Sequence, residues 1–97
     1  MSSTIEFKEY ISEQLSDIDG ITFRQMMGEY LIYENGILFG GIYDDRLLVK
    51  ITDGNKKFGM ETAIPYDGGK LMFFVTDVDD RDKLKNIVSE TVCGLKK

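Results

Sequence analysis

The stretch that decides the fold covers residues 30–50 and reads YLIYENGILFGGIYDDRLLVK. Asn35-Gly36 separates two apolar runs, and this pair favours a tight type I′ turn because both of its central positions need positive φ. Asp44-Asp45 predicts a second tight turn of the same length. We therefore predict three antiparallel strands here, at residues 30–34, 37–43 and 46–51.

The alternation of apolar and polar residues continues on both sides of this stretch. It predicts a strand at residues 21–27 and another at residues 70–76, after a loop that contains Pro65. Residues 56–64 favour a short helix, although Gly59 weakens that pattern.

Each end of the chain carries the apolar spacing of an amphipathic helix. A capping box begins at Ser3, and the apolar stripe that follows predicts a helix that ends near Ser16. The aspartate-rich run at residues 77–80 offers N-caps for a last helix, whose amphipathic stripe consists of Leu84, Ile87, Val88, Thr91 and Leu95. We predict one α+β domain over residues 1–97, an antiparallel meander of about five strands flanked by N- and C-terminal helices.

Counting outward from the two tight turns predicts which side chains share a face of the sheet, because directly paired residues point the same way. The face beneath the helices is then apolar throughout and carries Leu31, Tyr33, Leu38, Gly40, Ile42, Leu47, Val49 and Ile51. The opposite face is mixed and carries Tyr30, Ile32, Glu34, Ile37, Phe39, Gly41, Tyr43, Arg46, Leu48 and Lys50. Apolar area with a polar rim is typical of an interaction site.

Two alternatives bear on this second face. A β-bulge at Gly40-Gly41 would exchange part of the assignment between the faces. The short helix or the loop around Pro65 could instead fold over the mixed face and cover it.

The charge of the chain limits its classes of partner. It carries 17 acidic and 12 basic side chains, a formal net charge of −5, and the basic ones are scattered. A nucleic-acid interface needs clustered positive charge to displace counterions. The apolar runs are too short to cross a bilayer, no signal peptide is recognisable, and the single Cys93 suits a reducing compartment. We expect a cytoplasmic protein with no membrane partner and no direct nucleic-acid partner.

Groups that could carry chemistry are scarce in this sequence. It has no histidine, and Cys93 has no apparent base nearby. The acidic run that begins at Asp77 fails as a calcium loop because Arg81 and Asp82 occupy positions that need a ligand and a glycine, so we interpret it as helix capping. We therefore expect no catalytic residues, no metal, no cofactor and no enzymatic activity.

Arg24 is the exception, since it lies in the middle of a predicted strand. A cation in that position needs an acidic partner or an anionic ligand. A structural salt bridge and a bound anion both satisfy this need, and the salt bridge is the favoured interpretation.

Residues 22–50 resemble the N-terminal domain of the TfoX (Sxy) competence-regulator family. That family typically shows an Arg-x-Met-Phe-Gly element, a Tyr-x-x-Gly hairpin and then Asp-x-Leu-Tyr-Leu-Lys. The matching residues here are Arg24, Met26, Gly28, Tyr30, Tyr33, Gly36, Phe39, Asp45, Leu47 and Lys50. Met27 stands where the family usually has Phe, and Glu29 where a second Gly is common.

The resemblance implies a fold like that of small secretion chaperones and a protein-binding context, in a stand-alone domain without the helical C-terminal domain of the full-length regulators. We interpret the chain as a non-enzymatic regulatory or adaptor-like protein-binding module related to competence regulators. The sequence does not specify its protein partner, and a second copy of the chain is one candidate. The predicted binding residues are Arg24, Tyr30, Ile32, Ile37, Phe39, Tyr43, Leu48 and Lys50. The alternative is a small-ligand or anion-binding domain centred on Arg24 and Tyr30.

Overall fold

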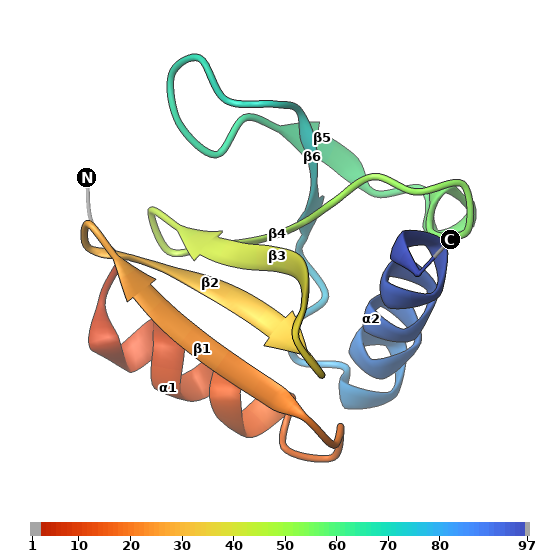
Figure 1. The fold of residues 1–97 in the computed structure, drawn as a ribbon, viewed down its shortest axis with the longest axis horizontal. Coiled ribbons are helices and arrows are strands. Elements are labelled where there is room, and N and C mark those ends of the chain that lie inside the picture. Colours follow the sequence, from red (N-terminus) through yellow and green to blue (C-terminus); the bar gives the residue numbers. More distant parts are fainter. Residues whose placement is uncertain (1–2, 97) are drawn as a thin grey trace.

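Two helices and a six-stranded antiparallel sheet make up the computed structural model, which describes residues 3–96 (Figure 1). Along the sheet the strands follow the order β1-β2-β3-β4-β6-β5. The elements in chain order are α1 (Ile5–Gln14), β1 (Ile21–Met26), β2 (Glu29–Glu34), β3 (Ile37–Tyr43), β4 (Arg46–Val49), the 3₁₀ turn η1 (Lys56–Phe58), β5 (Glu61–Ala63), β6 (Met72–Val75) and α2 (Arg81–Leu95). The predicted α+β class and the flanking helices are confirmed.

The region predicted as a short helix at residues 56–64 holds a helical turn followed by a strand. The 3₁₀ turn ends at Gly59, whose φ of 65° is left-handed and reverses the chain. Residues 61–63 then pair with β6 as the edge strand β5. The helix prediction was therefore right for one turn only, and the sheet gains a sixth strand from the remainder.

Three tight turns join the first four strands. Asn35-Gly36 and Asp44-Asp45 have positive φ at both positions, which confirms the two predicted type I′ turns. A third such turn lies at Met27-Gly28, with φ values of 53° and 84°. Strand β1 therefore ends at Met26, one residue before the predicted end.

A β-bulge in β3 separates the two predicted registers. Ile32 lies opposite Gly40 and Tyr33 lies opposite Leu38, so Phe39 is an extra residue in β3. Both glycines are required by close backbone approach: a Cβ on Gly40 would lie 2.3 Å from the Leu48 carbonyl oxygen, and one on Gly41 would lie 2.6 Å from that of Tyr30. The protein therefore adopts the bulge alternative raised from the sequence, with the extra residue at Phe39, directly before the predicted Gly40-Gly41 pair.

Because of the bulge, the faces predicted for the side chains of β2 and of the first half of β3 were wrong. The side chains that face the helices include Tyr30, Ile32, Ile37 and Phe39, which were predicted on the opposite face. Leu31, Tyr33 and Leu38 point away from the helices instead. Beyond the bulge the prediction holds, because Ile42, Leu47 and Val49 lie in the core beneath the helices.

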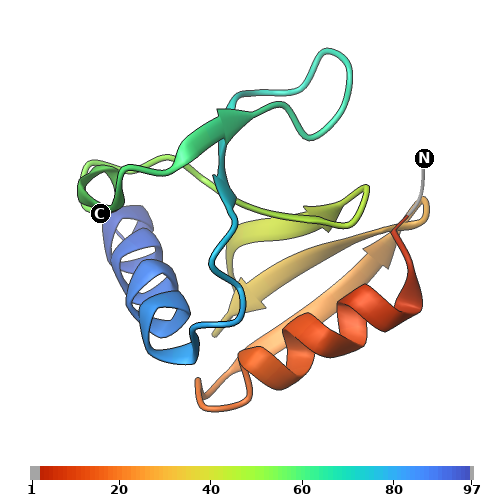
Figure 2. The same cartoon turned by 180° about the vertical axis from the view of Figure 1, so that it is seen from behind.

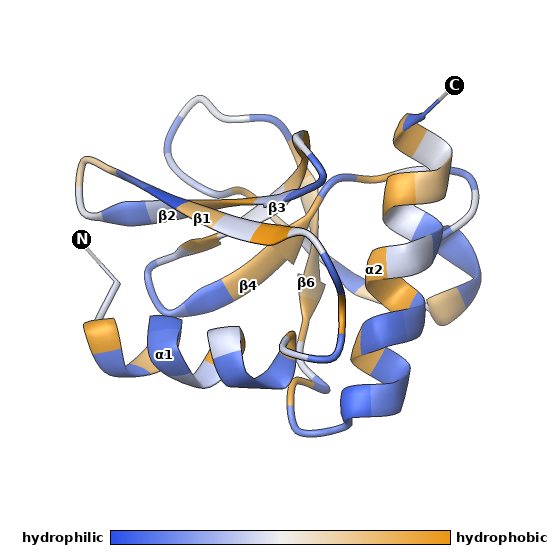
Figure 3. Ribbon diagram, turned by 60° about the horizontal axis from the view of Figure 1, so that its bottom comes forward, coloured by the Kyte–Doolittle hydropathy of each residue, from blue (hydrophilic) through white to orange (hydrophobic). Residues whose placement is uncertain are grey.

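Both helices cover the same face of the sheet, as the view from behind shows (Figure 2). Helix α1 contributes Ile11 to the core, as does its C-cap Leu15, and α2 contributes four buried apolar side chains, Leu84, Ile87, Val88 and Val92. Apolar and polar residues alternate along α2, whereas β4 and β6 are almost entirely apolar (Figure 3). Among residues 3–96, no helix has the length and apolar character needed to cross a bilayer.

Side-chain caps fix the start of each helix. Thr4 is the N-cap of α1, one residue after the predicted Ser3, and its Oγ1 accepts a hydrogen bond from the Phe7 amide. Asp80 caps α2 by accepting from the Lys83 amide at 3.1 Å, which confirms the capping interpretation of the acidic run.

Two polar side chains, Glu29 and Asn55, attach the loops to this frame. The Glu29 carboxylate accepts hydrogen bonds from the Ser3 Oγ at 2.6 Å and from the Asp44 amide at 3.2 Å, so it joins the start of α1 to two hairpins. The buried side chain of Asn55 donates to the Lys50 carbonyl and to the Thr91 hydroxyl, both at 2.8 Å. The connection after β4 is thereby held against α2.

Candidate functional site

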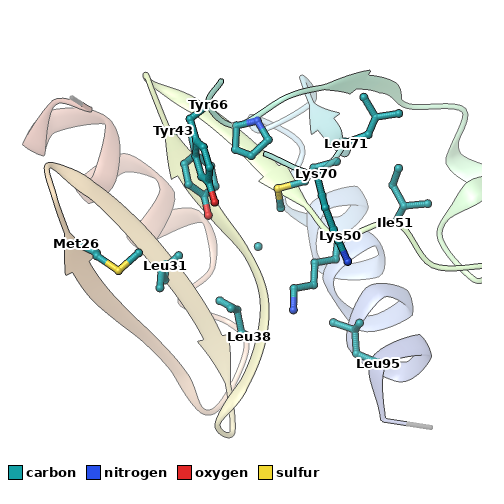
Figure 4. Close-up of a pocket in the computed structure, with 13 residues that line it drawn as sticks. Met26, Leu31, Leu38, Tyr43, Lys50, Ile51, Tyr66, Lys70, Leu71 and Leu95 are labelled. Carbon is teal, nitrogen blue, oxygen red and sulfur yellow. The ribbon is translucent and has the colours of Figure 1, made fainter. Parts of the chain in front are cut away.

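The face of the sheet turned away from α1 and α2, here called the open face, carries Arg24, Leu31, Tyr33, Leu38, Tyr43, Leu48 and Phe74. A groove of about 560 Å³ runs along it and is called the open-face groove (Figure 4). Leu31 and Leu38 line it from β2 and β3, Met72 from β6, and Leu71 from the loop that precedes β6. Most of its lining is apolar.

The bulge and the loop at residues 64–71 together shape this groove. The bulge turns Leu31 and Leu38 outward, and both side chains line the groove together with Gly40. The loop is held by Arg46, whose Nη2 donates to the Ile64 carbonyl at 3.2 Å, and by Tyr66, whose ring centroid lies 6.1 Å from that of Tyr43. The pair β2–β3 and the loop at residues 64–71, which are far apart in the sequence, thus form opposite walls of the groove.

Part of the open face is sealed by its own neighbours, as one of the two sequence alternatives proposed. Leu48 is fully buried, and Tyr43 is 8% exposed beneath Tyr66. The remaining apolar surface lies at the groove and at the edge beyond Tyr43.

The charged groups of the groove are all positive. Lys50 and Lys70 line it, and no aspartate or glutamate does, although the chain has 17 acidic residues. Neither lysine has a carboxylate oxygen within 4.0 Å among residues 3–96. In Figure 4 the side chains of Lys50, which follows β4, and of Lys70, in the loop before β6, both extend along the groove.

Tyr43 keeps its proton at neutral pH and presents a phenol to the groove. Burial raises the pKa of Tyr43 above its ordinary value, and the neighbouring Tyr66, Glu29 and Tyr33 raise this pKa further. A neutral phenol can donate one hydrogen bond and accept others.

An exposed apolar edge adjoins the groove and is called the methionine ridge; it consists of Met26, Met27 and Tyr66. These side chains are 50%, 95% and 63% exposed. Together with Glu29, Leu31 and Tyr43 they line a second hollow of about 360 Å³. The Glu29 carboxylate is already engaged by Ser3 and Asp44, so the surface that remains for a partner is apolar.

The predicted binding residues are divided between the two faces. Tyr30, Ile32, Ile37 and Phe39 belong to the core cluster beneath the helices, so that part of the predicted surface was wrong. Tyr43, Leu48, Arg24 and Lys50 lie on the open-face side, where Leu48 is buried and Lys50 lines the groove. Sequence reasoning missed Met26, Leu31, Leu38, Tyr66 and Lys70, and the signal that could have found the two leucines is the Gly40-Gly41 pair.

A site centred on both Arg24 and Tyr30 is not formed. Arg24 pairs with Leu31 and Gln25 pairs with Tyr30, so the side chains of Arg24 and Tyr30 point to opposite faces. The Tyr30 ring lies on the helix side, 6.0 Å from the Lys8 ammonium. Arg24 is exposed, and within the described residues the predicted salt bridge to it is absent.

Comparison with known proteins places this arrangement in a family. A family model described as the TfoX N-terminal domain matches residues 13–93, which is most of the chain. The chain belongs to the TfoX N-terminal domain family.

One curated relative of this TfoX N-terminal domain is the "Uncharacterized 12.7 kDa protein in trpE 5'region" of Spirochaeta aurantia. The two are 24% identical over an alignment that covers 98% of this chain and 85% of that protein. No solved structure matches the chain.

The residues that carry the family resemblance have distinct places in this TfoX N-terminal domain. Gly28, Gly36 and Asp45 form the tight turns, and Tyr30, Phe39 and Leu47 lie in the core. The remaining ones lie on the open-face side: Arg24, Met26, Tyr33 and Lys50. The first two groups serve the turns and the core. The residues of the third group are exposed or partly exposed.

The groups that line the groove are suited to contact with a partner. Among residues 3–96, no three histidine, cysteine, aspartate or glutamate side chains come together in a way that could hold a metal ion. The groove supplies apolar contact area, tyrosine hydroxyls and two ammonium groups. These groups suit a partner with an apolar part and a polar or anionic part.

Proposed function

We propose that this TfoX N-terminal domain is a non-catalytic, regulatory or adaptor-like module that binds a protein partner through the methionine ridge. The observation that carries the proposal is the placement of Met27, which is 95% exposed at the tip of the β1–β2 hairpin. Family membership supports a regulatory setting, and the lone exposed Cys93 suits the reducing cytoplasm.

Met27 is a poor residue for its local structure. Its φ of 53° is a left-handed value that an unbranched apolar side chain adopts at a cost, and tight turns of this type favour Asn or Gly there. The side chain gains little in return, because almost all of its surface is in solvent. Local rules are most often broken at functional positions, which favours Met27 as a contact residue.

The neighbours of Met27 extend the apolar surface. Met26 and Tyr66 flank it within the ridge, and Leu71 and Ile64 are each more than half exposed on the adjoining loop. Methionine and aromatic side chains are enriched in the centres of protein interfaces, where flexible thioethers adapt to different partners. A protein docked on the ridge would therefore cover the largest exposed apolar side chains of the hairpin and of the loop.

Affinity capture with matched variants tests the proposal. The tagged wild type, Met27→Asn and Lys85→Asn would be incubated with native cytoplasm and the retained proteins quantified; Lys85 is an exposed control on α2. We expect a protein that the wild type and Lys85→Asn retain equally and that Met27→Asn retains about tenfold less, equivalent to about 1.4 kcal/mol. Identical captured proteins for all three baits would contradict the proposal.

A second copy of the chain is one candidate for the partner, and light scattering decides it. A dimer of the wild type that becomes a monomer with Met27→Asn would identify the partner as another copy. A wild type that stays monomeric at high concentration would exclude the second copy and leave another protein as the partner.

A further inference from the structure

We propose that the open-face groove binds a small amphiphilic carboxylate, a molecule with an apolar chain or ring that ends in a carboxyl group. The apolar part would lie against Leu31, Leu38 and Met72, and the carboxylate would meet the ammonium groups of Lys50 and Lys70. This site goes beyond the protein-binding role of the methionine ridge, and either can fail while the other holds.

Charge complementarity identifies the polar end of the ligand. The groove contains two lysines and no acidic side chain, in a chain whose formal net charge is −5. Lys50 is only partly exposed, and no described carboxylate neutralises it or Lys70. Cations beside low-dielectric apolar walls concentrate anions, so the preferred occupant carries negative charge at this end.

The remaining lining identifies the body of the ligand. Apart from the lysines and tyrosines, the groove presents leucine, isoleucine, methionine, proline and glycine. Its volume of about 560 Å³ falls within the range of roughly 300–1,000 Å³ that is usual for small-molecule sites. An ion without an apolar part would leave most of this lining in contact with water.

The position of the groove favours a small molecule over an extended peptide. Peptides that bind to sheets usually add as a strand to an edge, where free backbone N–H and C=O groups supply the hydrogen bonds. Leu31 and Leu38 reach the groove from β2 and β3, which are interior strands of the sheet. The groove therefore does not follow an edge strand, which favours a small ligand bound by side chains.

Three probes that share one alkyl chain separate the contributions of charge and apolar contact. The full chain, with labelled methyl groups, would be titrated with decanoate, decylamine and decanol below their micelle concentrations, with calorimetry and methyl NMR as readouts. We expect decanoate to bind at least tenfold more tightly than decylamine and to shift the methyl signals of Leu31, Leu38 and Leu71. Equal binding of decylamine and decanoate, or shifts confined to the core beneath the helices, would overturn the proposal.

Two variants test the role of the lysines directly. Lys50→Met and Lys70→Met keep an unbranched apolar side chain and remove the charge, so each should weaken decanoate binding about tenfold and leave decanol binding unchanged. Undiminished decanoate binding in both variants would overturn the proposal.

The ridge variant Met27→Asn should bind decanoate like the wild type, even if its protein capture is lost. Loss of decanoate binding in Met27→Asn would overturn a separate groove site. A protein partner that is captured normally by Lys50→Met and Lys70→Met, while decanoate binds neither these variants nor the wild type, would refute the groove proposal and leave the ridge proposal intact.

Discussion

Met27 is the residue at which the fold and the proposed function make opposite demands. Two of the three tight turns carry Asn or Asp at their first position, as this turn type favours, whereas the turn between β1 and β2 carries a methionine. If Met27 is present because it binds a partner, a residue that suits the turn should make the fold more stable than methionine does.

We therefore predict that Met27→Asn stabilises the protein by about 0.5–1 kcal/mol, because Asn-Gly is the preferred pair for a type I′ turn. Chemical denaturation at neutral pH measures the free energy of unfolding, and Lys85→Asn serves as a surface control. A loss of stability with Met27→Asn would show that the thioether contributes to folding and would remove the main argument for the ridge.

Tyr43 gives the protein a dependence on alkaline pH. Because burial, followed by Tyr66, Glu29 and Tyr33, raises the folded-state pKa of Tyr43 above the ordinary value of 10.0, the unfolded chain ionises first as the pH rises. The contribution of the neutral phenol to stability is complete below that ordinary pKa. It is lost as the pH rises through the folded-state pKa.

We expect Tyr43→Phe to lose less stability than the wild type between neutral pH and strongly alkaline pH. Urea unfolding at several pH values, together with the tyrosinate absorbance, measures the effect. The same alkaline loss of stability in Tyr43→Phe and in the wild type would contradict this assignment.

At the scale of elements, two of the three tight turns and both helices follow from local chemistry, and for that reason the sequence predicted them; the turn at Met27-Gly28 was missed because methionine is not a turn residue. Asn35-Gly36 and Asp44-Asp45 are short-range signals, and the apolar spacing in α2 repeats over several turns. Strand β5 was missed because its three residues are stabilised by pairing with β6, a contact that no local pattern encodes.

The groove escaped prediction for a related reason. Counting from each turn gave the right register near that turn, but the two registers meet in the middle of β3, and one extra residue there reverses every side chain beyond it. The glycine pair marked the position of the bulge, whereas the decision to bulge depends on the backbones of β2 and β4. Lys70 and Tyr66 reach the groove from a loop, and loop geometry is not readable from periodicity.

We predict that Gly41→Ala destabilises the protein by about 1–3 kcal/mol, since its Cβ would lie 2.6 Å from the Tyr30 carbonyl oxygen. Gly54→Ala is the matched control, because the nearest atom there is the flexible Glu90 carboxylate at 3.0 Å. Denaturant titrations of both variants make the comparison. Equal and small effects would show that the bulge does not need the glycine.

At the scale of the whole molecule, the sheet divides the protein into a sealed side and an available side. The helices cover one face and bury most of its apolar side chains, while the loop at residues 64–71 covers only part of the other face (Figures 1 and 4). The methionine ridge and the open-face groove adjoin on the available face and share Met26 and Tyr66. The groove proposal depends on which side chains the bulge in β3 turns outward, whereas the ridge proposal depends on the exposed turn at Met27.

Solvent paramagnetic relaxation of the methyl groups in the unmodified protein tests that dependence most directly. A soluble paramagnetic agent broadens the signals of methyl groups that solvent can approach. We predict broadening for Met27, Leu31 and Leu38, and none for Ile32 or Ile42, which lie in the core beneath the helices. Protected signals for Leu31 and Leu38 together with broadened signals for Ile32 would mean that the unbulged register is correct, and the groove would then lose its basis. A protected signal for Met27 would remove the basis of the ridge.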